Sequence, residues 1–198
     1  DGDRYSLTLK LFGLAQLHAP VRRLASYATP LMRDLAQRSR QANHLAVFDR
    51  GAAVVIAQQE APDYWGLSIR VGSHISLFDT GSGHVLLAFR SDEEREMMIS
   101  EHVRSRKDAD LGAEFYERLN QIRERGYEMM ASAQTAGVYN LSAPILGPDG
   151  RGIAALTCPY IALVNAPAAP DITQAIGMVQ KTAAELSALA GATIAVQA

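Results

Sequence analysis

Cysteine is almost absent from this chain of 198 residues, in which Cys158 stands alone. A single cysteine excludes an intramolecular disulfide framework and any zinc site built from cysteine pairs. It indicates a reducing compartment, and the cytoplasm is the simplest expectation. No basic residue adjoins Cys158 to lower its pKa, so we expect a buried, unreactive thiol.

Long apolar runs and an excess of one charge are also missing. No segment has eighteen consecutive apolar residues, and the N-terminal DGDRYSLTLK lacks the cationic start and apolar centre of a signal peptide. We therefore expect no membrane contact and no export signal. The 19 basic and 21 acidic residues give a net charge of −2, so the bulk of the chain has no polycationic surface for nucleic acid.

Motifs that hold cofactors or catalytic groups are absent. The glycine-rich loop DTGSG precedes a helix, but His84 and Val85 follow its last glycine where a P-loop needs lysine and then serine or threonine. Leu86 stands where a dinucleotide fingerprint needs its third glycine, and Ser82 lacks the glycine spacing of a nucleophile elbow. The histidines show no metal-ligand spacing. We expect no cofactor, no metal site and no enzyme.

The chain does contain clear strand and helix patterns. Alternation of apolar and polar residues predicts strands at 44–49, 52–60, 64–71, 127–132, 138–146 and 152–161. Helical periodicity predicts helices at 11–18, about 82–89, from 91 onwards, 111–125 and 171–190. Turn residues at 49–51 and 147–150 join strands into hairpins. Helices at both ends with two blocks of strands between them indicate an α/β (α+β) fold with an antiparallel sheet.

Prolines divide the expected helices near the N-terminus. We expect Pro20 to close the first helix. Pro30 lies inside a second helical pattern, where either it kinks one helix or Thr29 caps a new helix with Pro30 as its first residue. We expect the second arrangement.

The glycine-rich loop admits two interpretations. Bare backbone N–H groups at a helix N-terminus bind anions, so Gly81, Ser82 and Gly83 could hold a carboxylate. Alternatively, Gly72 and Gly81 relieve positive φ angles and Ser82 caps the helix, with no ligand involved. The residues alone favour the structural interpretation, because it explains most glycine clusters.

The order of the motifs resembles one family. RYSLTLKLFGLA, NHLAVFDRGAAVVIAQQE, RVGSHISLFDTGSGHVLLAF and GYEMMASAQTAGVYNLSAPILGPDGRGIAALTCP follow one another along the chain. This sequence resembles the IclR family of bacterial transcriptional regulators over essentially its whole length. The resemblance implies a GAF/profilin-like domain with a curved, mainly antiparallel sheet of about six strands and flanking helices.

The resemblance also implies a domain division. Residues 1–18 look like the end of the wing strand and the linker helix of a missing N-terminal winged helix-turn-helix, and residues 19–198 look like an effector-binding domain. The first forty residues have seven basic and three acidic side chains, which agrees with a basic, DNA-binding neighbour upstream. DNA contact is expected only through that missing domain.

The implied function is to sense a small organic or aromatic acid and so to modulate operator binding by a repressor or activator, as a homodimer or tetramer. Carried over by position, the ligand contacts would be Tyr64, Leu67, Ile75, Gly81, Ser82, Val138, Asn140 and Thr157. The family usually has lysine where His84 stands, and serines and a glycine near Thr157. A small-acid-processing enzyme and a purely dimerising module on the same fold are the alternatives.

Overall fold

A single six-stranded sheet forms the centre of the molecule. The computed structural model describes residues 19–63, 66–105, 111–164 and 168–191. The strands are β1 (Asn43–Asp49), β2 (Ala52–Gln59), β3 (His74–Ile75), β4 (Glu128–Ala131), β5 (Val138–Leu146) and β6 (Gly152–Ile161). They lie in the order β3-β2-β1-β6-β5-β4, and every neighbouring pair is antiparallel. The expected antiparallel α+β fold is confirmed.

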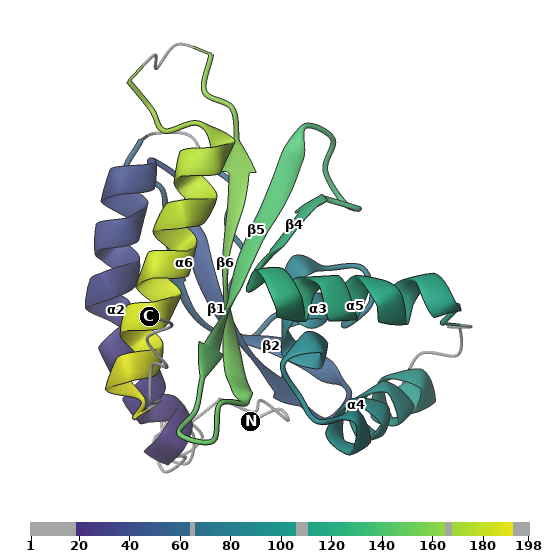
Figure 1. Cartoon of the computed structure of the whole chain (residues 1–198). Helices are drawn as coiled ribbons and strands as arrows, with labels where there is room; N and C mark the ends of the chain where they lie inside the picture. The colour runs from purple at the N-terminus through teal and green to yellow at the C-terminus, as the bar shows by residue number, and fades with distance from the viewer. Residues whose placement is uncertain (1–18, 64–65, 106–110, 165–167, 192–198) are drawn as a thin grey trace, which may run out of the picture.

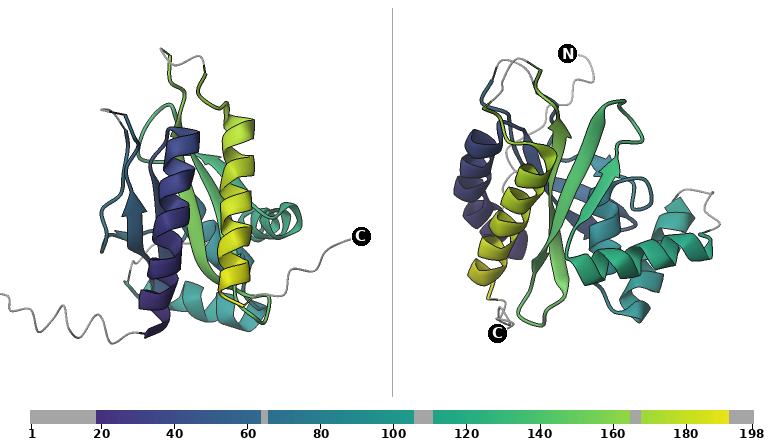
Figure 2. Two further views of the ribbon diagram at one scale, coloured as in Figure 1. Left: turned by 90° about the vertical axis from the view of Figure 1, so that its left-hand side faces the viewer. Right: turned by 45° about the horizontal axis from the view of Figure 1, so that its top comes forward.

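Helices cover the two faces of this curved sheet (Figure 1). On one face lie α2 (Ala19–Ser39) and α6 (Ile172–Leu189), side by side in both views of Figure 2. On the other lie α3 (Gly81–Ala88), α4 (Asp92–Ser105) and α5 (Ala113–Arg125). Among the described residues, no helix is long and apolar enough to cross a membrane.

Two apolar cores lie on either side of the sheet. Between the sheet and the α2/α6 pair, fully buried leucines such as Leu35, Leu45 and Leu156 pack together. Beneath α3 the sheet contributes alanines, Ala46 and Ala155 among them. Because these side chains are short, α3 can approach the sheet closely, and all eight of its residues are buried.

Most local signals are confirmed. The β1–β2 hairpin turns at Arg50 and Gly51, which have φ angles of 42° and 79°. Asp171 and Gln174 form a capping box at the start of α6, and Gly126 ends α5 with a φ of 82°. Cys158 is buried, and burial raises its pKa to about 12, as expected for an unreactive thiol.

The prediction of a strand at 64–71 is wrong over its described part. Residues 66–70 form no strand, and the chain joins the edge of the sheet only after Gly72, whose N–H donates to the carbonyl of Val55 at 2.7 Å. Leu67 and Ile69 are half-buried and alternate with exposed residues because they face a cavity. Alternating apolar and polar residues indicate that one side of a segment is buried. Here the buried side faces a cavity, and the described segment pairs with no strand of the sheet.

The prediction that Pro30 begins a new helix is also wrong. The helix at 11–18 that Pro20 is expected to close lies outside the described residues, and Pro20 itself is in the first turn of α2, where a helix needs no N–H donor. Pro30 lies inside the same helix at an exposed position, so the carbonyl that it leaves without a partner faces water. Thr29 does not cap a second helix, because its hydroxyl donates to the carbonyl of Ala25 at 2.8 Å. The expected strand and helix within residues 1–18 lie outside the described residues.

Candidate functional site

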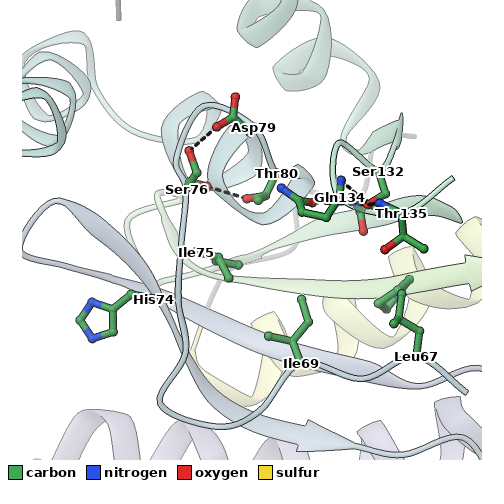
Figure 3. Close-up of a pocket in the computed structure, with 12 residues that line it drawn as sticks. Leu67, Ile69, His74, Ile75, Ser76, Asp79, Thr80, Ser132, Gln134 and Thr135 are labelled. Carbon is green, nitrogen blue, oxygen red and sulfur yellow. Dashed lines mark hydrogen bonds between the residues drawn. The ribbon is translucent and has the colours of Figure 1, made fainter. Parts of the chain in front are cut away.

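A cavity of about 380 Å³ lies between the sheet and three loops (Figure 3). Its walls come from the segment after β2, from β3 and the loop that leads into α3, from the β4–β5 loop, and from the floor of strands β5 and β6. The lining residues are Leu67, Ile69, His74, Ile75, Ser76, Asp79, Thr80, Ser132, Gln134, Thr135, Asn140 and Pro159. This volume lies near the lower end of the roughly 300–1,000 Å³ typical of small-molecule pockets.

The lining combines apolar and neutral polar side chains. Leu67, Ile69 and Ile75 provide the apolar part, and no lysine or arginine is among the lining residues. The titratable side chains in the lining are His74 and Asp79, and both are exposed. An anionic ligand would therefore be bound mainly by N–H and O–H donors.

Thr80, the residue before α3, lines one end of the cavity, and Gly81 and Ser82 follow it directly behind this wall. Thr80 is the N-cap: its hydroxyl oxygen accepts from the Gly83 N–H at 3.1 Å and its hydroxyl donates to the Ser76 carbonyl at 2.7 Å. The N–H groups of Gly81 and Ser82 are the first two of the helix and have no acceptor among the described residues. Such N–H groups, together with the helix dipole, favour an anion.

Asn140 places an unpartnered amide in the same cavity. Its side chain lines the wall, the residue is only 8% exposed, and it makes no hydrogen bond to any described residue. Its amide is not among the polar groups that are sealed from solvent without a partner, so it is accessible from the cavity. The cavity therefore offers a donor and an acceptor to whatever fills it.

The β4–β5 loop is shaped by Ser132. Its hydroxyl oxygen accepts from the N–H groups of Gln134 and Thr135, both at 3.2 Å, and its own N–H donates to the carbonyl of Val138 at 2.8 Å. These bonds fix a tight turn that presents Gln134 and Thr135 to the cavity (Figure 3). The contacts predicted from the sequence include no residue of this loop, although a serine followed two and three residues later by polar residues is a turn signal.

Beneath α3, His44, Ser82, Ser142 and Thr157 form a buried hydroxyl network. The Thr157 hydroxyl lies 2.7 Å from that of Ser82 and 2.8 Å from that of Ser142. Nε2 of His44 lies 3.2 Å from the Ser82 hydroxyl, and its Nδ1 has no partner among the described residues. Burial lowers the pKa of His44 to about 4, so the ring is neutral at pH 7. This network joins the start of α3 to β1, β5 and β6.

Beside it, His84, Arg118, Arg125 and Glu128 form the Glu128 cluster. Oε2 of Glu128 lies 2.8 Å from Nε of Arg118 and 3.1 Å from Nδ1 of His84, and Oε1 lies 2.5 Å from Nη2 of Arg125. Burial by itself would raise the pKa of Glu128, but hydrogen bonds from His84 and Arg118 and their charges lower it to about 2. The carboxylate is therefore ionised at pH 7.

The glycines of α3 permit close packing. A Cβ atom on Gly81 would lie 2.5 Å from the Ser142 hydroxyl oxygen, and one on Gly83 would collide with the backbone of Leu77. Neither glycine has a positive φ, so the expectation of a strained backbone at Gly81 is wrong. A valine at Gly81 would disturb folding as well as any ligand, so this substitution cannot separate the two roles.

The structure brings some of the expected ligand contacts together. Leu67, Ile75 and Asn140 line the cavity, and a Cβ on Gly81 would lie 3.3 Å from that of Asn140. The other expected ligand contacts among the described residues lie behind the cavity wall. The hydroxyls of Ser82 and Thr157 are hydrogen-bonded to each other, and Val138 is buried at the start of β5. Tyr64 lies outside the described residues. No group of three or more histidine, cysteine or acidic residues within the described ranges could hold a metal.

Comparison with known proteins identifies relatives. Residues 18–188 match the family model described as bacterial transcriptional regulator IclR C-terminal. The chain is 29% identical over 163 residues to the HTH-type transcriptional regulator KdgR of Escherichia coli strain K12. That alignment covers 81% of this chain and 62% of KdgR, so the chain spans less than two thirds of that relative's length. The relatives are named as regulators, which confirms the expectation that the chain is not an enzyme.

Solved structures share the fold. The C-terminal domain of E. coli KdgR superimposes with a TM-score of 0.68 at 24% identity, covering 85% of this chain and 99% of that one. An IclR homolog from Microbacterium hydrocarbonoxydans, complexed with 4-hydroxybenzoate, gives a TM-score of 0.73 at 20% identity. It covers 93% of this chain and 75% of that one.

Proposed function

The chain belongs to the IclR family of bacterial transcriptional regulators, and on that premise we propose that residues 19–198 are the effector-binding domain of such a regulator. The cavity takes a small organic or aromatic acid, and its occupancy modulates operator binding. Residues 1–18 are the end of the wing strand and the linker helix of a winged helix-turn-helix, which makes the DNA contacts. The family match from residue 18 onwards agrees with this division.

The observation that carries the proposal is a set of unpartnered polar groups at the N-cap end of a small cavity whose lining mixes apolar and polar side chains. The Gly81 and Ser82 N–H groups and the Asn140 amide lack partners among the described residues. A helix N-terminus contributes about 0.3–1 kcal/mol to anion binding, and up to roughly 2 when partly buried. Charge-assisted hydrogen bonds add roughly 1.5–3 kcal/mol each, enough for micromolar affinity after the costs of binding.

We assign the expected contacts different roles. Leu67 and Ile75 contact the apolar part of the acid, and Asn140 with the Gly81 and Ser82 backbone binds its polar part. Tyr64, which lies outside the described residues, stays a proposed contact on the family resemblance alone. Val138 and Thr157 act from behind the wall, Thr157 by holding Ser82 through its hydroxyl. The relative with bound 4-hydroxybenzoate supports an acid of about that size.

A ligand screen tests this function. Differential scanning fluorimetry against keto, hydroxy and aromatic acids should find at least one acid that raises the melting temperature, and its uncharged amide analogue should not. No stabilisation by any acid at millimolar concentration would contradict the proposal and favour a purely dimerising module. Chemical conversion of the stabilising acid would favour an acid-processing enzyme.

We further propose that the chain forms a homodimer or tetramer in the cytoplasm and that the full regulator acts as a repressor or an activator. Two-fold symmetry matches the paired half-sites that helix-turn-helix proteins read. Light scattering should show at least a dimer, and a strict monomer at high concentration would contradict the assembly. Operator binding by residues 19–198 alone would contradict the assignment of DNA contacts to another domain.

A further inference from the structure

His84 connects two of the loops that form the cavity. Its Nε2 lies 2.7 Å from the carbonyl oxygen of Phe78, in the loop of residues 76–80. Its Nδ1 lies 3.1 Å from Oε2 of Glu128, at the start of β4. Strand β4 leads directly into the wall formed by residues 132–135. The buried His84 side chain thus contacts both the loop that forms one wall of the cavity and the strand that leads into the other wall.

Both ring nitrogens of His84 face hydrogen-bond acceptors. A carbonyl oxygen and a carboxylate oxygen are both acceptors, so a ring with one proton would leave one contact without a hydrogen. The ring lies one turn into α3, with the Phe78 carbonyl on one side and the Glu128 carboxylate on the other.

The same carboxylate fixes the far side of the connection. Arg118 donates to the oxygen that also faces His84, and Arg125 donates to the other oxygen. Both arginines come from α5, and Phe115 of that helix packs edge-on against the His84 ring with centroids 5.4 Å apart. Glu128 thus contacts Arg118, Arg125 and His84, and it cannot move toward the cavity without breaking these contacts.

We propose that His84 is a positioning residue of the effector cavity. Through Phe78 and Glu128 it joins the loop of residues 76–80 to β4 and so fixes the separation of the two walls that the ligand contacts. The inference rests on the proposed function only in naming the cavity as the effector site.

Hydrogen exchange in the ligand-free protein tests this role. The reporters on one wall are the Phe78 and Gly83 amides, and on the other the Ser132 and Thr135 amides, because each donates to a group of its own wall. In His84→Gln the amide side chain can reach only one of the two acceptors with a donor. Both pairs of amides should then exchange about tenfold faster or more, relative to amides within β6.

The matched control is Val85→Ala, the next residue of the same helix. Val85 is fully buried, so the variant loosens the core beneath α3 without touching the His84 contacts. Glu128→Gln should accelerate the same amides at least as much, because it also releases Arg118 and Arg125, and the double variant should match Glu128→Gln alone. The positioning role is refuted if the reporter amides exchange no faster in His84→Gln than in Val85→Ala. It is also refuted if the double variant exchanges faster than Glu128→Gln alone.

The two proposals fail separately. Exchange is measured without ligand, so a screen that finds no stabilising acid refutes the effector function and leaves the positioning role intact. Unchanged wall exchange in His84→Gln refutes the positioning role alone.

Discussion

Two equally buried histidines, His44 on β1 and His84 on α3, have opposite surroundings. His44 is 2% exposed and His84 is 3% exposed. His44 meets a single hydroxyl and has a bare Nδ1, whereas His84 lies between a carbonyl and an ionised carboxylate. Burial alone lowers the pKa of His44 to about 4. Two rings of similar burial therefore differ in the groups that face them, a neutral hydroxyl for His44 and a carboxylate for His84.

The comparison extends to the two clusters that contain these rings. The hydroxyl network is neutral and attaches the start of α3 to the sheet, whereas the Glu128 cluster is charged and attaches its first turn to β4 and α5. Arg118 and Arg125 are 41% and 36% exposed at their side chains, so water screens the outer half of the charged cluster. The two clusters should therefore respond differently to substitution and to pH.

Removing the charge at Glu128 should have the largest effect. Glu128→Gln leaves the His84 ring and two arginines without their anion, and we expect a loss of about 3 kcal/mol in the free energy of unfolding. Chemical denaturation at pH 7 measures it. The matched control is Asp149→Asn, which weakens an exposed pair with Arg151 and should cost under about 1 kcal/mol. Equal losses in both variants would contradict the charged cluster.

Acid should destabilise the protein first through His44. Its pKa falls from 6.5 unfolded to about 4 folded, so below pH 6.5 the unfolded chain binds a proton that the folded chain does not. Stability should decline between pH 6.5 and 4, by up to roughly 3 kcal/mol. Unfolding free energies measured across this range should decline less in His44→Gln than in the parent. An unchanged slope would show that His44 is not the group responsible.

A second acid phase should come from Glu128. Its pKa is 4.5 unfolded and about 2 folded, so its contribution is fully present above pH 4.5 and disappears as the pH falls toward 2. Glu128→Gln should lack this phase and keep the one above pH 4.5. The two phases together would separate the neutral cluster from the charged one by pH alone.

Within the hydroxyl network, Thr157→Val should have an intermediate effect. The valine keeps the shape of threonine but removes the oxygen that bonds both Ser82 and Ser142, so we expect a loss of about 2 kcal/mol. Ser142→Ala removes one of those two bonds and should cost about half as much. Thermal unfolding compares the two variants, and a larger loss in Ser142→Ala would contradict the central place of Thr157.

Much of the fold was predictable from the sequence. The strands at 138–146 and 152–161 have the bounds expected from their alternation and the turn between them. The strand prediction failed at 66–70 because a segment that faces a cavity buries every second residue, as a strand in a sheet also does. The path of α2 through Pro30 depends on whether the freed carbonyl is exposed, which the sequence does not show.

The site was predictable only where residues are close in sequence or match the family. Resemblance to the family indicated Leu67, Ile75 and Asn140, which line the cavity. The pairing of His84 with Glu128 joins residues 44 apart, and no local pattern connects them. Likewise, the bonds of Ser82 were not foreseen, because its partner Thr157 lies 75 residues away.

Asn140 should show the smallest effect on stability and the most direct effect on function, because it is buried in the cavity wall without a partner. Asn140→Leu has a similar volume and should change the unfolding free energy by under about 0.5 kcal/mol. Isothermal titration with the acid that stabilises the protein most measures the dissociation constants of parent and variant. We predict a rise of about tenfold or more in the variant, the equivalent of one lost hydrogen bond. Equal constants would contradict the central claim that this cavity is the effector site.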